Sequence, residues 1–147
     1  MVSLAEASRR LKTVSEKKLQ KKVADIVVTD LQIRDLKREE FKKGLKPDGS
    51  IIGKYSNPSY QAYKEAKNPQ ANGNVDLIDT GSFTNRLFVF SEGEGKFIFK
   101  SQDDKSELLQ NKYGKDIMGF NQEDWNKLQI NKYAPKLINY IKQLTRF

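Results

Sequence analysis

The chain has 147 residues, of which 37% are apolar and 31% are charged, a composition that suits one domain with a modest core. It contains neither cysteine nor histidine, which excludes disulfides, thiolate metal sites and nucleophile pairs that depend on histidine. No apolar run approaches the roughly 20 residues of a membrane-spanning helix, and the first residues lack the apolar stretch of a secretory signal. We therefore expect a protein that stays in a cytoplasm or leaves it by lysis, without membrane contact.

The net charge of +8 is unevenly spread along the sequence. Residues 1–46 carry a net charge of +6, residues 47–105 carry −1, and residues 106–147 carry +3. A basic end suggests a polyanionic neighbour, either nucleic acid or an acidic protein surface, although a lysine-rich helix can equally be a solvated one.

Residues 3–28 have apolar side chains at helical spacing, and Ser3 with Glu6 has the form of a capping box. The other helix faces are basic, and we predict that they contact DNA or a protein partner. The candidate contact residues are Arg9, Arg10, Lys17, Lys18, Lys21 and Lys22. A second helix is predicted over residues 31–43, and it ends at Gly44. Residues 1–43 thus form a basic helical region.

Residues 44–75 are predicted to be an extended loop. Lys46-Pro47-Asp48-Gly49 is a strong turn signal, because proline presets the turn and glycine accepts a positive φ. Further on, asparagine, glycine and proline interrupt the segment, and one short helix is expected at 59–66. A loop of this length in a small domain is often functional, or becomes ordered against a partner.

Residues 76–105 are predicted to contain a β-hairpin. Strands are expected at 83–90 and 96–100, with a glycine-rich turn at 91–95. Residues 51–52 or 76–78 can add a third strand.

Residues 106–147 are expected to be helical. Asn121 caps a helix there, and Pro135 breaks or restarts it. The whole chain is predicted to be one α+β domain, in which a small antiparallel sheet is packed by N-terminal helices and a C-terminal helix.

One enzymatic interpretation rests on Asp103-Asp104-Lys105, which follows the second strand. A Mg²⁺-dependent nuclease needs several carboxylates and often a lysine near the phosphate, and Asp48 or Asp79 is a candidate for the upstream carboxylate. In a chain this charged, the same pattern also fits a solvated turn. The glycines of the hairpin turn lie between glutamates and lack the lysine and hydroxyl of a phosphate-binding loop.

An ordered set of short motifs precedes the final helix, and the resemblance that it carries covers about residues 36–144. These are Phe41-Lys42-Lys43-Gly44-Leu45-Lys46-Pro47-Asp48-Gly49, Gly53-Lys54-Tyr55-Ser56, Val75-Asp76-Leu77-Ile78-Asp79-Thr80-Gly81-Ser82-Phe83 and Tyr113-Gly114-Lys115-Asp116-Ile117-Met118-Gly119-Phe120. In this order they resemble the small tail-completion and virion-morphogenesis proteins of tailed bacteriophages.

The resemblance implies a structural virion protein at the head–tail junction or the tail end, which acts as a ring in the neck or tail and is made in the host cytoplasm. It implies no catalytic site, cofactor or metal, and the partners would be other copies and adjoining connector or tail proteins, with DNA in the channel. The motif positions to which it assigns a structural role are Asp48, Gly49, Asp79, Thr80, Gly81, Tyr113, Gly114 and Gly119.

Overall fold

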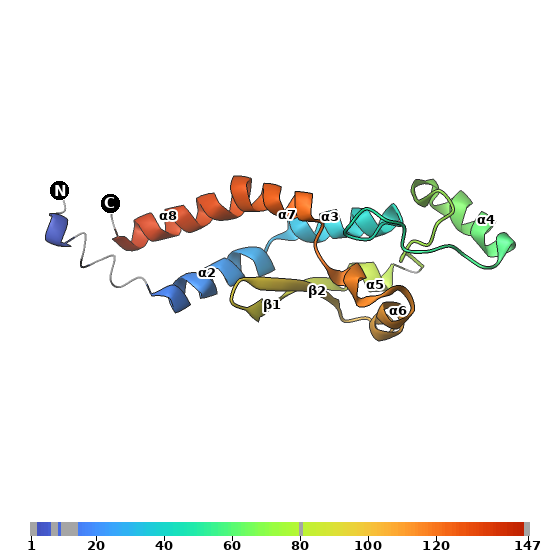
Figure 1. Ribbon diagram of the computed structural model, residues 1–147, viewed down its shortest axis with the longest axis horizontal. Coiled ribbons are helices and arrows are strands. Elements are labelled where there is room, and N and C mark those ends of the chain that lie inside the picture. Colours follow the sequence, from blue (N-terminus) through green and yellow to red (C-terminus); the bar gives the residue numbers. More distant parts are fainter. Residues whose placement is uncertain (1–2, 7–8, 10–14, 80, 146–147) are drawn as a thin grey trace.

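The computed structural model describes residues 3–6, 9, 15–79 and 81–145, which form an elongated, mostly helical α+β structure (Figure 1). A two-stranded antiparallel hairpin packs against helices from both the N-terminal and the C-terminal parts of the sequence, as predicted. Helix α2 and helix α8 lie beside each other at one end of the molecule, and α4 lies at the other (Figure 1).

The N-terminal region contains α2 (Glu16–Val28) and α3 (Leu31–Lys42). Ser15 caps α2: its backbone is extended, and its hydroxyl accepts a hydrogen bond of 3.1 Å from the Lys18 N–H. One continuous helix over residues 3–28 was therefore a wrong prediction, because an extended residue interrupts it. The predicted cap at Ser3 is present, since its Oγ accepts from the Glu6 N–H at 3.1 Å. Residues 7–8 and 10–14 lie outside the described part.

The segment after Gly44 is a long connection with little regular structure. The predicted turn is confirmed, since the Gly49 N–H donates to the Lys46 carbonyl at 3.0 Å. The short helix is also confirmed, as α4 (Pro58–Lys67), and a 3₁₀ turn, η1 (Pro69–Ala71), follows it. The predicted third strand was wrong: within the described residues, the segment makes only isolated bridges and the sheet has two strands.

The hairpin consists of β1 (Leu87–Gly93) and β2 (Lys96–Ser101). The first strand begins later than predicted, because the preceding residues form a short helix, α5 (Ser82–Asn85). A distant side chain explains the difference. The Arg38 guanidinium, on α3, donates to the carbonyls of Thr84 and Asn85 at 2.8 and 3.1 Å, which satisfies the end of the short helix.

The C-terminal region is mostly helical. After α6 (Ser106–Tyr113) and the 3₁₀ turn η2 (Lys115–Met118), α7 (Gln122–Leu128) begins at the predicted cap, where Asn121 Oδ1 accepts from the Asp124 N–H at 3.0 Å. A π-helical turn, η3 (Gln129–Tyr133), leads into α8 (Ala134–Thr145). Pro135 comes just after this π-helical turn, so the proline does not end the helix, and the regular hydrogen-bonding pattern changes in the turn before it. Helix α6 lies within the segment that the sequence predicts to be helical.

A buried lysine links α3 to the C-terminal region. Lys37 Nζ donates to Glu40 Oε1 and to the Gly119 carbonyl, both at 2.7 Å, and its side chain is 1% exposed. The ammonium also lies 4.7 Å from the centre of the Phe41 ring and 5.4 Å from that of Phe99. Burial lowers the pKa of Lys37, and the Glu40 carboxylate opposes this shift. The lysine thus satisfies polar groups that would otherwise be unpaired in the core.

We predict that Lys37→Met lowers the free energy of unfolding by about 3–5 kcal/mol, because it removes one partner of a buried pair and leaves the other groups unsatisfied. Urea unfolding followed by circular dichroism measures this change. Lys43→Met, at an exposed position after the same helix, serves as the control and should change stability by no more than about 0.5 kcal/mol. Equal effects of the two substitutions would contradict the structural role of Lys37.

Candidate functional site

An open pocket of about 680 Å³ lies between the 54–60 segment, the 75–83 segment and α6. Apolar side chains form part of its lining, namely Val75, Leu77, Phe83 and Leu109. Tyrosines and lysines complete it, namely Tyr55, Tyr60, Tyr113, Lys54, Lys64, Lys105 and Lys112. We call this site the lysine-rimmed pocket. Its volume and mixed lining are typical of sites that hold a small molecule or a short stretch of chain.

A buried ion pair holds α4 against the pocket. Lys64 is the one residue of α4 that is buried, and its Nζ lies 2.6 Å from Asp76 Oδ1. The two side chains are 5% and 1% exposed. Lys64 also donates to the Ile78 carbonyl, and Asp76 accepts from the Asn68 amide at 2.7 Å and the Ile78 N–H at 3.1 Å. Both charges are thus compensated and hydrogen-bonded, as buried charges must be.

Tyrosines form the wall of the pocket beside this pair. The Tyr55 hydroxyl accepts from the Asp76 N–H at 3.3 Å, and burial raises the pKa of Tyr55 to about 12. Tyr60 packs edge-on against Tyr55 at 5.2 Å and is stacked with Tyr63 at 6.1 Å. Tyr60 and Tyr63 remain 43% and 57% exposed, so this wall continues onto the surface.

The structure brings several of the predicted motif residues to this pocket. Asp79 and Gly81, from one motif, and Tyr113, from another, all line it. The Asp79 carboxylate is 69% exposed and lies 3.6 Å from Lys105 Nζ. Gly81 has a φ of 86° and caps α5, so it positions the short helix rather than the strand. Thr80 lies outside the described residues.

The remaining motif residues shape turns that do not line the pocket. Gly114 has a φ of 101°, and a side chain there would collide with the Asp116 carboxylate, so the bend after α6 requires glycine. Gly119 has an ordinary φ of −77°, and its role is to present its carbonyl to Lys37. Asp48 accepts from the Ser50 N–H at 2.9 Å within the turn that Gly49 completes.

The residues of the nuclease interpretation are only partly together. The Asp103 carboxylate accepts hydrogen bonds from the Lys105 N–H, at 2.8 Å, and from the Ser82 hydroxyl. The Ser82 hydroxyl and then the Lys105 N–H lower the pKa of Asp103. Asp103 therefore caps the turn before α6, and Lys105 reaches Asp79 instead. In the part of the chain that the structure describes, no three acidic side chains converge so as to hold a metal ion.

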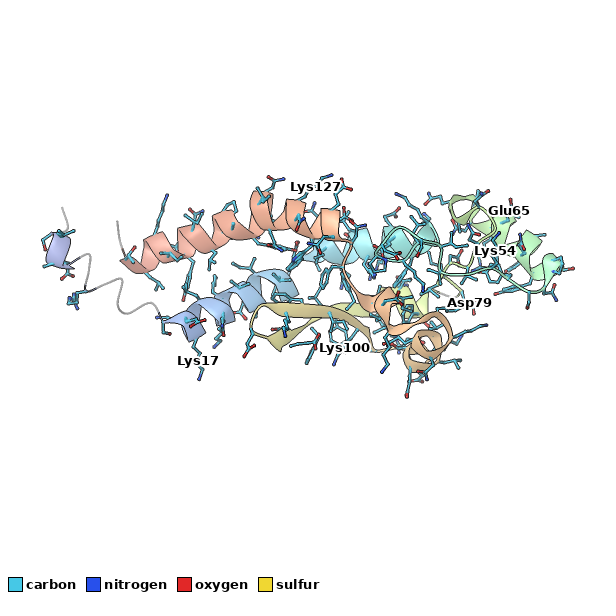
Figure 2. The ribbon with its side chains drawn as sticks, viewed as in Figure 1. Lys17, Lys54, Glu65, Asp79, Lys100 and Lys127 are labelled. Atoms are coloured by element: carbon cyan, nitrogen blue, oxygen red, sulfur yellow. The ribbon has the colours of Figure 1, made fainter. Side chains whose placement is uncertain are left out.

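The basic face predicted on the first helix lies far from the pocket. Figure 2 shows Lys17 and Lys54 at opposite ends of the molecule. Lys17, Lys18 and Lys21 are exposed on α2, whereas Lys22 is half-buried with its Nζ 5.0 Å from the centre of the Tyr140 ring. Arg9 donates to Glu6 at 3.0 and 2.6 Å, and Arg10 lies outside the described part. The exposed face that remains for an anionic partner is thus the one with Lys17, Lys18 and Lys21.

Sequence reasoning missed the Lys64–Asp76 pair and the lysines of the rim, Lys54 and Lys112. One signal was available, because Asp76 stands in a short apolar run where a charge needs a partner. The identity of that partner was not readable from the sequence.

Comparison of the chain with protein-family models, with curated proteins and with solved structures found no match. No helix among the described residues combines the length and the apolar character needed to cross a membrane.

We predict that Lys64→Met frees α4 from the pocket, because it leaves Asp76 buried without its counter-charge. The expected cost is about 3–5 kcal/mol, and hydrogen exchange should show lost protection in α4. Lys67→Met, at an exposed position on the same helix, is the matched control and should keep that protection. Unchanged exchange in Lys64→Met would contradict the anchoring role of the ion pair.

Proposed function

We propose that this chain is a structural protein of a tailed-phage virion, a tail-completion or neck component that acts by forming a ring. The observation that supports this most is the presence of two unlike exposed surfaces along the elongated fold. One is the lysine-rimmed pocket beside α4 and α6, and the other is the hairpin. Unlike surfaces at separate places on a subunit suit a head-to-tail interface, which closes into a ring when the rotation between copies allows it.

The hairpin adds to this argument. Its sheet has two strands, so the outer edge of each strand is without a strand partner among the described residues. Such edges present unpaired N–H and C=O groups and are ready to pair with another chain. In a larger assembly, a neighbouring chain would form hydrogen bonds with these N–H and C=O groups.

Exposed apolar side chains on the helices agree with this function. Among them are Leu31 at 61%, Leu108 at 65%, Ile130 at 72% and Ile138 at 50%. Single exposed apolar residues are common on monomers. Here they occur on α3, α6, η3 and α8, and contacts with neighbouring copies or adjoining connector and tail proteins would bury them.

The exposed lysines of α2 fit the same setting. In a ring around a channel, Lys17, Lys18 and Lys21 would face non-specific DNA or an acidic adjoining protein. The protein would be made in the host cytoplasm and reside in the neck or tail of the virion. The proposal needs no cofactor, metal ion or membrane. The second candidate, a Mg²⁺-dependent nuclease or DNA-binding accessory protein, is favoured only by the 3.6 Å approach of Lys105 to Asp79.

The two functions make different predictions for the purified protein. As a ring component, the wild-type chain should form one dominant closed oligomer as its concentration rises, measured by light scattering and native mass spectrometry. A nuclease should instead cut plasmid DNA when Mg²⁺ is added. A chain that stays monomeric and cuts DNA, and that loses the cutting in Asp103→Ala but not in the neighbouring Asp104→Ala, would overturn the proposal.

A further inference from the structure

We infer that the hairpin turn of one copy docks into the lysine-rimmed pocket of the next copy. The hairpin turn is residues 91–95, which comprise the end of β1 and the two residues, 94 and 95, that connect it to β2. This inference rests on the proposed ring function and assigns the interface that builds the ring. The arguments for it are charge, shape and the places of the two surfaces in the fold.

The pocket carries a surplus of positive charge. Lys64 and Asp76 neutralise each other inside it, and Lys105 approaches Asp79 at its edge. Lys54 and Lys112 also line the pocket, and neither makes an ion pair with any other described residue. Two lysines thus remain available to an anionic group. The tyrosines and apolar side chains around them would contact the backbone and carbon atoms of the same occupant.

The hairpin turn carries the matching charge. Glu92 and Glu94 are exposed in it, and neither makes an ion pair with any other residue that the structure describes. Lys96, which is also exposed, follows the turn at the start of β2. Asp79, at the edge of the pocket, provides a carboxylate for this lysine to face. The acidic residues of the turn can therefore face the lysines of the pocket, while the lysine after the turn faces a carboxylate.

The shape of the turn suits insertion. Gly93, Glu94 and Gly95 have φ angles of 89°, 54° and 74°, which fold the chain back within a few residues. A Cβ atom placed on Gly93 or Gly95 would meet no atom within 4 Å, so the turn stands clear of the rest of the molecule. A narrow turn without bulky side chains at its glycines fits a pocket of about 680 Å³.

The turn cannot reach the pocket of its own chain. β2 has six residues and leads from the turn towards α6, which lies beside the pocket. A strand of this length spans about 20 Å. Figure 1 shows the turn on the side of α2, with α4 and α6 towards the other end. Contact between turn and pocket must therefore join different copies, and its two halves are unlike, as a head-to-tail ring requires.

Cysteine cross-linking tests this contact directly, because the natural chain has no cysteine. Glu94→Cys protein and Lys112→Cys protein are mixed in equal amounts and oxidised gently. We expect the mixed dimer to dominate over both dimers of like chains. The control replaces Lys112→Cys with Lys127→Cys, since Lys127 lies on α7 away from the pocket (Figure 2). Equal cross-linking with the two lysine positions would overturn the inference.

Charge reversal provides the second test. Glu92→Lys with Glu94→Lys, or Lys54→Glu with Lys112→Glu, should each weaken assembly at least about tenfold, because like charges then face each other. All four changes in one chain should restore assembly. Glu123→Lys with Lys127→Glu reverses an exposed pair on α7 and should have no effect. Circular dichroism verifies that each variant is folded.

The outcomes separate this inference from the proposed function. Rings that form equally well in wild type and in both reversed variants would overturn the docking and leave the ring function intact. A wild-type chain that forms neither rings nor the mixed cross-link would contradict both. A third outcome is that Lys54→Glu with Lys112→Glu abolishes DNA binding, while Glu92→Lys with Glu94→Lys has no effect. The pocket would then bind a phosphate backbone, and the docking inference would be wrong.

Discussion

The buried ion pair between Lys64 and Asp76 is the constraint on which the candidate site depends. The one buried residue of helix α4 is Lys64, so this ion pair is the main buried contact that attaches the helix to the molecule. The same pair fixes the 75–78 segment and, through the Asp76 N–H, the hydroxyl of Tyr55. Lys64 and Asp76 both line the pocket, so its shape depends on the pair. A second buried lysine, Lys37, plays the equivalent part in the core by joining α3 to the Gly119 carbonyl. Paired burial of this kind makes the geometry sensitive to the loss of either partner.

The features that the sequence predicts well are those that depend on neighbours in the chain. Ser3 and Asn121 act as helix caps, and residues 46–49 form the expected turn, because each uses hydrogen bonds within a few residues. The failures involve long-range contacts. The apolar side chain of Phe83 favours a strand, but the residue lies in a short helix. Arg38 stabilises the end of this helix by donating to the carbonyl of Thr84, 46 residues away in the sequence. Residues 51–52 and 76–78 have a strand-like composition, but among the described residues neither segment pairs with the two-stranded sheet.

The sequence likewise predicts only part of the candidate site. The motif order gave Asp79, Gly81 and Tyr113 a structural role and predicted no pocket, although all three residues line this one. The motifs do not indicate that Lys64 is buried, because a lysine in a polar helix is expected to be exposed to solvent unless a buried partner is known. The same holds for Lys54 and Lys112, which become one surface only through the fold. Together, a pocket with unpaired lysines at one place and an acidic turn at another give an elongated chain the two unlike surfaces that a repeating assembly needs.

The central claim is that copies of this chain join head to tail into a closed ring. Electron cryomicroscopy of the purified oligomer tests it most directly, because the map shows both the symmetry and the surfaces in contact. The account predicts a cyclic ring in which every interface is the same pair of unlike surfaces, with density from a neighbouring hairpin in each pocket. A two-fold dimer that buries the same surface on both copies would contradict it.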